Sequence, residues 1–180
     1  MKANRPYSIE TYDPEWKKKY EEVSKRISDI LGESIISIEH IGSTSIEGMV
    51  AKPRVDVLVV VKDCSKIPAL AAELEGAGFS YHGGGYIGHN PADEYVSENV
   101  SDGIRVAGIH ILPEGNFEIA DYRNFRDYLR EHPTEKQRYM DIKKELFDTY
   151  PHDYEAYDSG KRALVLSILE KANEWASGQN

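Results

Sequence analysis

The stretch IEHIGSTSIEGMVAKPRVDVLVVV, residues 38–61, places a Gly-Ser turn between two apolar runs, and Asp56 stands near the start of the second run. The β-branched residues that surround Asp56 predict a strand that is buried on both faces. Gly42 permits a tight exit from the first run, and the small hydroxyl residues after it suit the start of a short helix toward Met49. A carboxylate on a buried strand beside such a turn raises the question of what it binds.

The turn and the acid together suggest a phosphate site. Gly42, Ser43 and Thr44 offer backbone N–H groups and hydroxyls of the kind that attract phosphate at a helix start. Lys52, with Arg54 close behind it, can neutralise the same anion. Asp56, on what should be an adjacent strand, could hold Mg²⁺ beside that phosphate, which is the arrangement that phosphoryl or nucleotidyl transfer requires. An alternative of equal weight is a plain turn, with Asp56 in a local salt bridge.

Composition narrows the class of protein. The 180 residues are 40% hydrophobic and 29% charged, which is typical of a globular protein, and we expect one domain over residues 1–180. The formal net charge of −9 argues against nucleic acid and anionic membranes as partners, and leaves a small molecule. Cys64 stands alone, which excludes an intramolecular disulfide, and the absence of an apolar leader predicts a cytoplasmic protein.

Periodicity predicts an α+β (mixed α/β) fold, with a mixed sheet flanked by helices and a C-terminal helical segment. Asp13 and Pro14 begin a helix that Gly32 ends. The expected strands are residues 7–12, 34–41, 54–61, 79–87, 94–98 and 104–112. Further helices are expected over residues 67–77, 117–130, from 134 onward, and as one long helix over 153–176.

The glycine-rich string GGGYIG, residues 83–88, satisfies the pattern G-x-G-x-x-G. A dinucleotide site of that kind must open a helix, yet His-Asn-Pro follows at residues 89–91. We therefore predict a hairpin or an active-site flap there.

The opening stretch resembles the signature of the GrpB family, which is assigned to the nucleotidyltransferase superfamily. The resemblance covers most of the chain, because TYDPEWKKKYEEV lies upstream, and GIHIL, FRDYLREHP, YMDIKKEL and GKRALVLSILEKANEW lie downstream. It implies a nucleotidyltransferase-like mixed sheet flanked by helices. It also implies a relationship to a domain that is fused to dephospho-coenzyme A kinase in some bacteria.

The chain departs from the catalytic pattern of that superfamily. The pattern has Asp-x-Asp on one strand, so that both carboxylates share a face and a metal. Here the second acid is replaced by Leu58, and a third acid, expected on the strand over residues 104–112, is replaced by His110. Asp56 and His110 are the candidate catalytic residues, and together with His40 they are the candidate metal ligands. Such a set suits Mn²⁺ or Zn²⁺ better than Mg²⁺.

Basic residues of the helical half are expected to complete the anion site. We expect Arg126, Tyr139, Lys143 and Lys161 to face Asp56 and to bind phosphate, since a lysine on an apolar stripe needs a partner or an anion. An equally weighted alternative is that Asp127 and Asp158 pair with these cations.

Two functions follow from these residues. The first is a nucleotidyltransferase-like enzyme that binds a nucleotide or another phosphorylated small molecule and uses a divalent metal. The second is a non-catalytic module with the same fold, which keeps the phosphate pocket as a sensor or scaffold. Leu58 favours the module, whereas convergence of His40, Asp56 and His110 would favour the enzyme.

Overall fold

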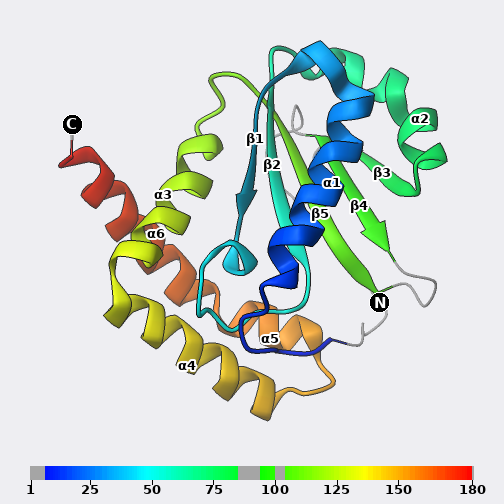
Figure 1. Cartoon of the computed structure of the whole chain (residues 1–180). Helices are drawn as coiled ribbons and strands as arrows, with labels where there is room; N and C mark the ends of the chain where they lie inside the picture. The colour runs from blue at the N-terminus through cyan, green and yellow to red at the C-terminus, as the bar shows by residue number, and fades with distance from the viewer. Residues whose placement is uncertain (1–6, 85–93, 100–103, 180) are drawn as a thin grey trace.

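The computed structural model describes residues 7–84, 94–99 and 104–179, and its centre is a five-stranded sheet with the order β1-β2-β5-β4-β3 (Figure 1). Strand β2 runs antiparallel to β1 and parallel to β5, and the pairs β5–β4 and β4–β3 are antiparallel. The strands are β1 Ile35–Ile41, β2 Val55–Val61, β3 Phe79–Gly84, β4 Glu94–Asn99 and β5 Arg105–Pro113. The expected mixed sheet with flanking helices is confirmed.

Helices begin and end near the residues that the sequence marked. The first turn of α1 (Glu15–Leu31) is capped by Asp13, whose Oδ1 accepts a hydrogen bond of 2.9 Å from the Glu15 amide, and Gly32 ends the helix at a φ of 52°. The other helices are the 3₁₀ segments η1 Gly32–Ser34, η2 Ser43–Ser45 and η3 Cys64–Leu70, and α2 Ala71–Gly76, α3 Glu118–Glu131, α4 Pro133–Thr149, α5 Tyr154–Gly160 and α6 Arg162–Ser177.

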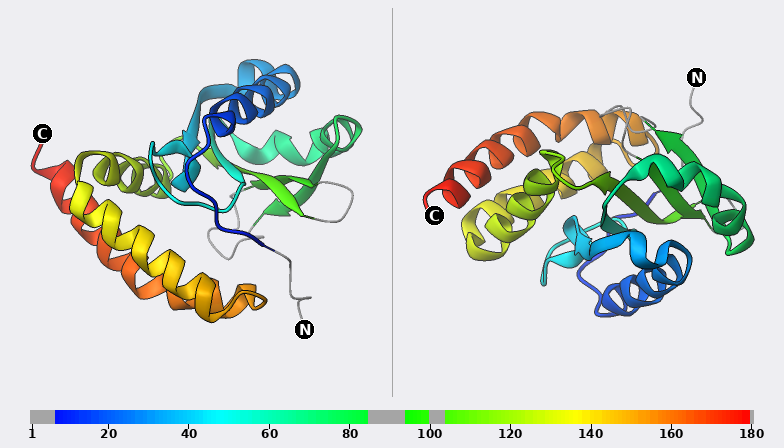
Figure 2. Two further views of the ribbon diagram at one scale, coloured as in Figure 1. Left: turned by 60° about the horizontal axis from the view of Figure 1, so that its bottom comes forward. Right: turned by 90° about the horizontal axis from the view of Figure 1, so that it is seen from above.

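The sheet separates two layers of helices. Helix α1 covers one face, and α3, α4 and α6 gather on the opposite side (Figures 1 and 2). The face under α1 is the larger core, where alternate valines of β2 pack against Trp16, Val23 and Ile27. On the other face, Leu58 and Leu112 pack against Ile119 of α3. The C-terminal helices have a core of their own, which includes Leu129, Tyr139, Met140 and Ile168.

Strand register decides which way Asp56 points. Asp56 lies opposite Ile41 of β1 and Gly108 of β5. Directly opposed residues share a face of a sheet, and so do residues two apart in a strand. Asp56 therefore lies on the face of Leu58, toward the C-terminal helices and away from α1.

Three of the expected elements differ in the structure. Residues 7–12 form no strand, because their pairing is limited to one isolated bridge between Glu10 and Ala51. The helix after Gly42 is only the 3₁₀ turn η2. The long last helix breaks into α5 and α6 at Lys161, beside Gly160, where a Cβ atom would lie 2.5 Å from Leu146 Cδ2. Close packing on α4 thus interrupts the pattern.

The structure describes only the first two residues of GGGYIG, so it tests the hairpin prediction only in part. Gly83 and Gly84 end β3, and β3 pairs with β4 in antiparallel fashion, whereas residues 85–93 lie outside the described residues. A search of the described residues finds no helix that is long and apolar enough to cross a membrane.

The side chain of Leu58 provides a test of the face toward α3. Leu58 is fully buried, so Leu58→Ala should lower the free energy of unfolding by about 2–5 kcal/mol, because it removes packed methyl groups and leaves a cavity. Leu166→Ala is the matched control, since Leu166 is 56% exposed and its loss should change stability by less than about 0.5 kcal/mol. Urea unfolding measures both, and equal effects would contradict the packing described here.

Candidate functional site

The carboxylate of Asp56 sits between two glycines. A Cβ atom on Gly42 would lie 3.0 Å from Asp56 Oδ2, and one on Gly108 would lie 3.0 Å from Oδ1 and 2.6 Å from the Tyr95 hydroxyl. Gly42 also has a φ of 69°, which favours glycine. The residue after β1 and the residue of β5 opposite Asp56 therefore both lack a side chain, and a side chain at either position would displace the carboxylate.

Arg54 and His110 set the charge of Asp56. Arg54 Nη2 lies 3.0 Å from Asp56 Oδ1 and 3.3 Å from Oδ2, and His110 Nε2 lies 3.9 Å from Oδ1. Burial alone would raise the pKa of Asp56, but Arg54 and His110 outweigh it, and the pKa falls below its usual value. Asp56 is thus a buried carboxylate that stays ionised at neutral pH.

His40 does not join this pair. It lies opposite Val57 in the β1–β2 register, on the face toward α1, where its ring stacks on Tyr20 at 4.7 Å. Its Nε2 is 2.9 Å from Thr44 Oγ1. The structure therefore does not bring His40 to the face that carries Asp56 and His110, because its place opposite Val57 directs it toward α1.

The remaining donors are few. Leu58, at the place of the second acid, lies in the aliphatic cluster under α3. Within the described ranges, no group of three or more His, Cys, Asp or Glu side chains is placed to hold a metal ion. Asp56 Oδ1 is buried and accepts no hydrogen bond of good geometry from a described residue, so Asp56 and His110 fit at most a single ion, not the pair of ions used by two-metal enzymes.

A cavity of about 690 Å³ opens over Asp56, between the sheet and the C-terminal helices. Eight of the predicted residues line it together: Gly42, Ser43, Thr44, Lys52, Asp56, Tyr139, Lys143 and Lys161. The sequence thus identified residues from four separate segments that the fold brings to one site.

Lys161 and Lys52 both line this cavity. Lys161 Nζ lies 2.8 Å from Asp158 Oδ1, which confirms the pairing proposed as an alternative from the sequence. Burial alone would lower the pKa of Lys161, but Tyr139 and Asp158 reverse the effect and raise it. Lys52 Nζ donates to the Tyr154 hydroxyl at 2.8 Å and lies over that ring, and burial, together with Lys161 and Arg54, lowers its pKa well below the usual value.

One known protein family matches most of the chain. Residues 6–171 match the model of the family described as GrpB protein. The chain belongs to the GrpB family. It is 32% identical to the crystal structure of conserved protein GrpB from Enterococcus faecalis, with a TM-score of 0.87 over 94% of this chain and 99% of that chain.

Two curated relatives of this GrpB chain are longer. UPF0157 protein YqkA of Bacillus subtilis is 31% identical over 98% of this chain, which spans 50% of YqkA. The dephospho-CoA kinase of Mycobacterium tuberculosis is 23% identical over 97% of this chain, which spans 48% of that protein. The chain therefore corresponds to about half the length of each of these two relatives.

Arg126 does not line the GrpB cavity, so the structure does not bring it together with the other predicted phosphate-binding residues. Its guanidinium bonds Asp127 at 2.7 and 2.9 Å, Glu39 Oε2 at 3.0 Å and the His40 carbonyl at 3.2 Å. These contacts use the cation to join α3 to β1. The alternative that Asp127 pairs with Arg126 is confirmed, because the guanidinium bonds this adjacent carboxylate directly.

Sequence reasoning missed the wall that α3 and α6 contribute. Glu118, Asp121, Tyr122 and Phe125 line the cavity from α3, and Leu166 does so from α6. Their helical spacing predicts only a common face. Nothing in the sequence indicates that this face lies opposite Asp56.

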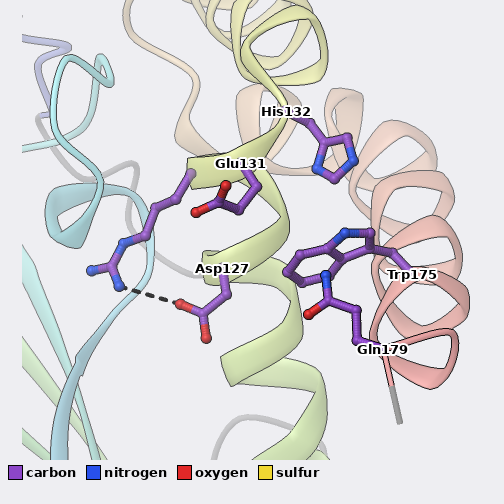
Figure 3. Close-up of a pocket in the computed structure, with 6 residues that line it drawn as sticks. Asp127, Glu131, His132, Trp175 and Gln179 are labelled. Carbon is purple, nitrogen blue, oxygen red and sulfur yellow. Dashed lines mark hydrogen bonds and ion pairs between the residues drawn. The ribbon is translucent and has the colours of Figure 1, made fainter.

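A second hollow of about 560 Å³ lies away from Asp56, between the end of α3 and the end of α6. Figure 3 shows Asp127, Glu131, His132, Trp175 and Gln179 around it. The ring of His132 stacks on Tyr128, and Arg130, which also lines the hollow, donates to Asp127. No residue predicted from the sequence as a site residue lines it.

His40 gives a pH test of the packing between β1 and α1. Burial lowers its pKa to about 4, helped by Arg130 and Arg126 and opposed by Asp56, against about 6.5 in an unfolded chain. The unfolded state therefore binds the extra proton first, so stability should fall as pH drops from 6.5 to 4, by at most about 1.4 kcal/mol per pH unit. Chemical unfolding of wild type and His40→Phe at each pH measures this contribution as the difference between the two proteins.

The difference should shrink as the pH falls, because His40→Phe has no proton to gain. Exposed His152 offers the control, and His152→Phe should follow the wild-type pH profile. A constant difference between wild type and His40→Phe from pH 7 to 4 would contradict a neutral, buried His40.

Proposed function

We propose that the cavity over Asp56 binds a nucleotide or another phosphorylated small molecule. The observation that carries this proposal is that the cations Arg54 and Lys161 line one cavity, together with the amines of Lys52 and Lys143, in a chain whose net charge is −9. A chain of this charge repels anions in general, so a cluster of cations has to be built locally to hold one. The hydroxyls of Ser43 and Thr44 add hydrogen-bond donors at the same end.

The charges in the cavity are arranged so that an added anion has partners. Arg54 and Lys161 are ionised, and each is paired with one carboxylate, Asp56 and Asp158 respectively. The side chain of Asp158 is 51% exposed, so a phosphate can replace it at Lys161 without stranding a buried charge. Lys161 is therefore the cation that we expect to meet the ligand.

The opposite wall suits the rest of a nucleotide. Tyr122, Phe125, Val165, Leu166 and Leu169 line it, and offer apolar and aromatic surface for a base. Glu118 and Asp121 lie on the same wall, where their charge would repel a second phosphate. The ligand that fits both ends has a phosphate at one end and a flat, uncharged group at the other.

Binding of ATP to Lys161→Met tests this proposal. Loss of a charged hydrogen-bond donor to phosphate costs roughly 1.5–3 kcal/mol, so calorimetry should show at least about tenfold weaker binding than wild type. Lys171→Met is the matched control, because Lys171 lies in α6, which begins directly after Lys161, and pairs with Glu135 outside the cavity; it should bind ATP within about twofold of wild type. A wild-type protein that binds neither ATP nor pyrophosphate would overturn the proposal.

A metal-assisted nucleotidyl transfer is the second candidate function, and the approach of His110 Nε2 to 3.9 Å from Asp56 Oδ1 favours it. A divalent ion bound there would polarise a phosphoryl oxygen. Arg54 already covers one side of the same carboxylate, and Leu58 supplies no second acid. These two features favour binding over two-metal catalysis.

Pyrophosphate release separates the two candidates. Wild type and Asp56→Asn are incubated with ATP, Mn²⁺ and a panel of alcohol and amine acceptors. Metal-assisted transfer predicts release that Asp56→Asn lowers by at least about 100-fold, a loss typical of an essential electrostatic group. Zinc and Mg²⁺ replace Mn²⁺ in parallel reactions, and ATP binding without release under all three metals would leave the binding module.

A further inference from the structure

Ser43 and Lys143 form a close pair at the wall of the cavity. Lys143 Nζ lies 2.6 Å from Ser43 Oγ and donates to the Val50 carbonyl at 2.9 Å. Lys143 comes from α4 and is 3% exposed, whereas Ser43 is half-buried at the start of η2. Both side chains line the cavity, and the amine is the more deeply buried of the two.

The surroundings of Lys143 favour a neutral amine. Burial lowers its pKa well below 10.5, and the nearby charge of Lys161 lowers it further, while Asp56 opposes them. No carboxylate contacts its Nζ within the described residues, and its other neighbour is the ring of Tyr139, at 4.2 Å. A neutral amine keeps an N–H on the Val50 carbonyl and directs its lone pair to Ser43 Oγ.

Backbone geometry presents Ser43 to the cavity. Gly42 has a φ of 69° and turns the chain sharply at the end of β1, which places Ser43 at the tip of the strand. Arg54 and Lys161 line the same cavity, and their charges can stabilise negative oxygens that develop in front of Ser43. A hydroxyl with a base beside it and cations in the same cavity is the arrangement of an activated nucleophile.

We propose that Ser43 is a nucleophile and Lys143 its general base, acting on a phosphate ester or anhydride. Lys143 Nζ takes the proton of Ser43 Oγ as Oγ bonds to phosphorus. The bond from phosphorus to the leaving oxygen breaks, and that oxygen takes the proton from Lys143, which leaves a phosphorylated Ser43. The step needs neither a metal nor the acid that Leu58 replaces, and it rests on the proposed function only for the identity of the natural substrate.

A fluorophosphonate tests the pair without any nucleotide. Attack by Ser43 forms an O–P bond and expels fluoride, so intact-mass and peptide analysis should find one adduct at Ser43. Ser43→Ala should abolish it, and Lys143→Met should slow it by about 10²–10⁴-fold, the usual contribution of a general base. Ser45→Ala and Lys144→Met are matched controls from the same turn and the same helix, and should react within about twofold of wild type.

A pH profile of the wild-type protein tests the pair without relying on variants that could fail to fold. For wild type the labelling rate at Ser43 should rise with pH and level off well below pH 10.5, because Lys143 must lose its proton first. The charged or titratable groups that face Lys143 are Lys161 and Asp56 from other segments, and Tyr139 from α4 itself. An unlabelled Ser43, or a rate that keeps rising past pH 10.5, would overturn the proposal, and labelling without ATP binding would overturn the proposed function alone.

Discussion

The ion pair between Arg54 and Asp56 is the constraint around which the site is built. It places a charge on strand β2, which lies between β1 and β5 and whose other side chains are aliphatic. A paired charge of this kind cannot be covered by methyl groups without a large desolvation cost. The glycines at positions 42 and 108 leave room for the carboxylate, and the C-terminal helices contact the sheet beside it, through Leu58 and Ile119.

In the part of the chain that the structure describes, the buried apolar residues form three separate clusters. The sheet packs on α1 through one core, and the C-terminal helices pack on one another and on Ile46, Met49 and Val50, which follow η2, through a second core. A small third cluster under α3 joins the two halves. The cavity occupies the rest of the boundary, where Lys52, Arg54, Asp56 and Lys161 keep the surface polar.

The charges in the cavity have different roles. Lys143 is buried and bonded to Ser43 and Val50, so it ties α4 to the turn after β1. Arg54 and Lys161 are ionised and lie at the ligand space. The cavity therefore combines two cations with a hydroxyl that lies beside an amine, and the proposed phosphate chemistry rests on this combination, whereas Leu58 supplies no second acid for a two-metal centre.

The sequence by itself determined the local elements and identified the residues on the Asp56 side of the cavity, but not the wall from α3 and α6. Strand β2, the capped helix α1, and the Gly-Ser turn beside Asp56 follow from short-range patterns, because caps, alternation and glycine conformations depend on neighbouring residues. Tertiary structure decided which of the candidate side chains meet. His40 does not lie at the site, because strand register turns it toward α1. Arg126 does not lie there either, because it is bonded to Glu39. The wall from α3 lines the cavity although the sequence did not predict it. Register and helix docking depend on contacts between residues far apart in the chain, and no local pattern records them.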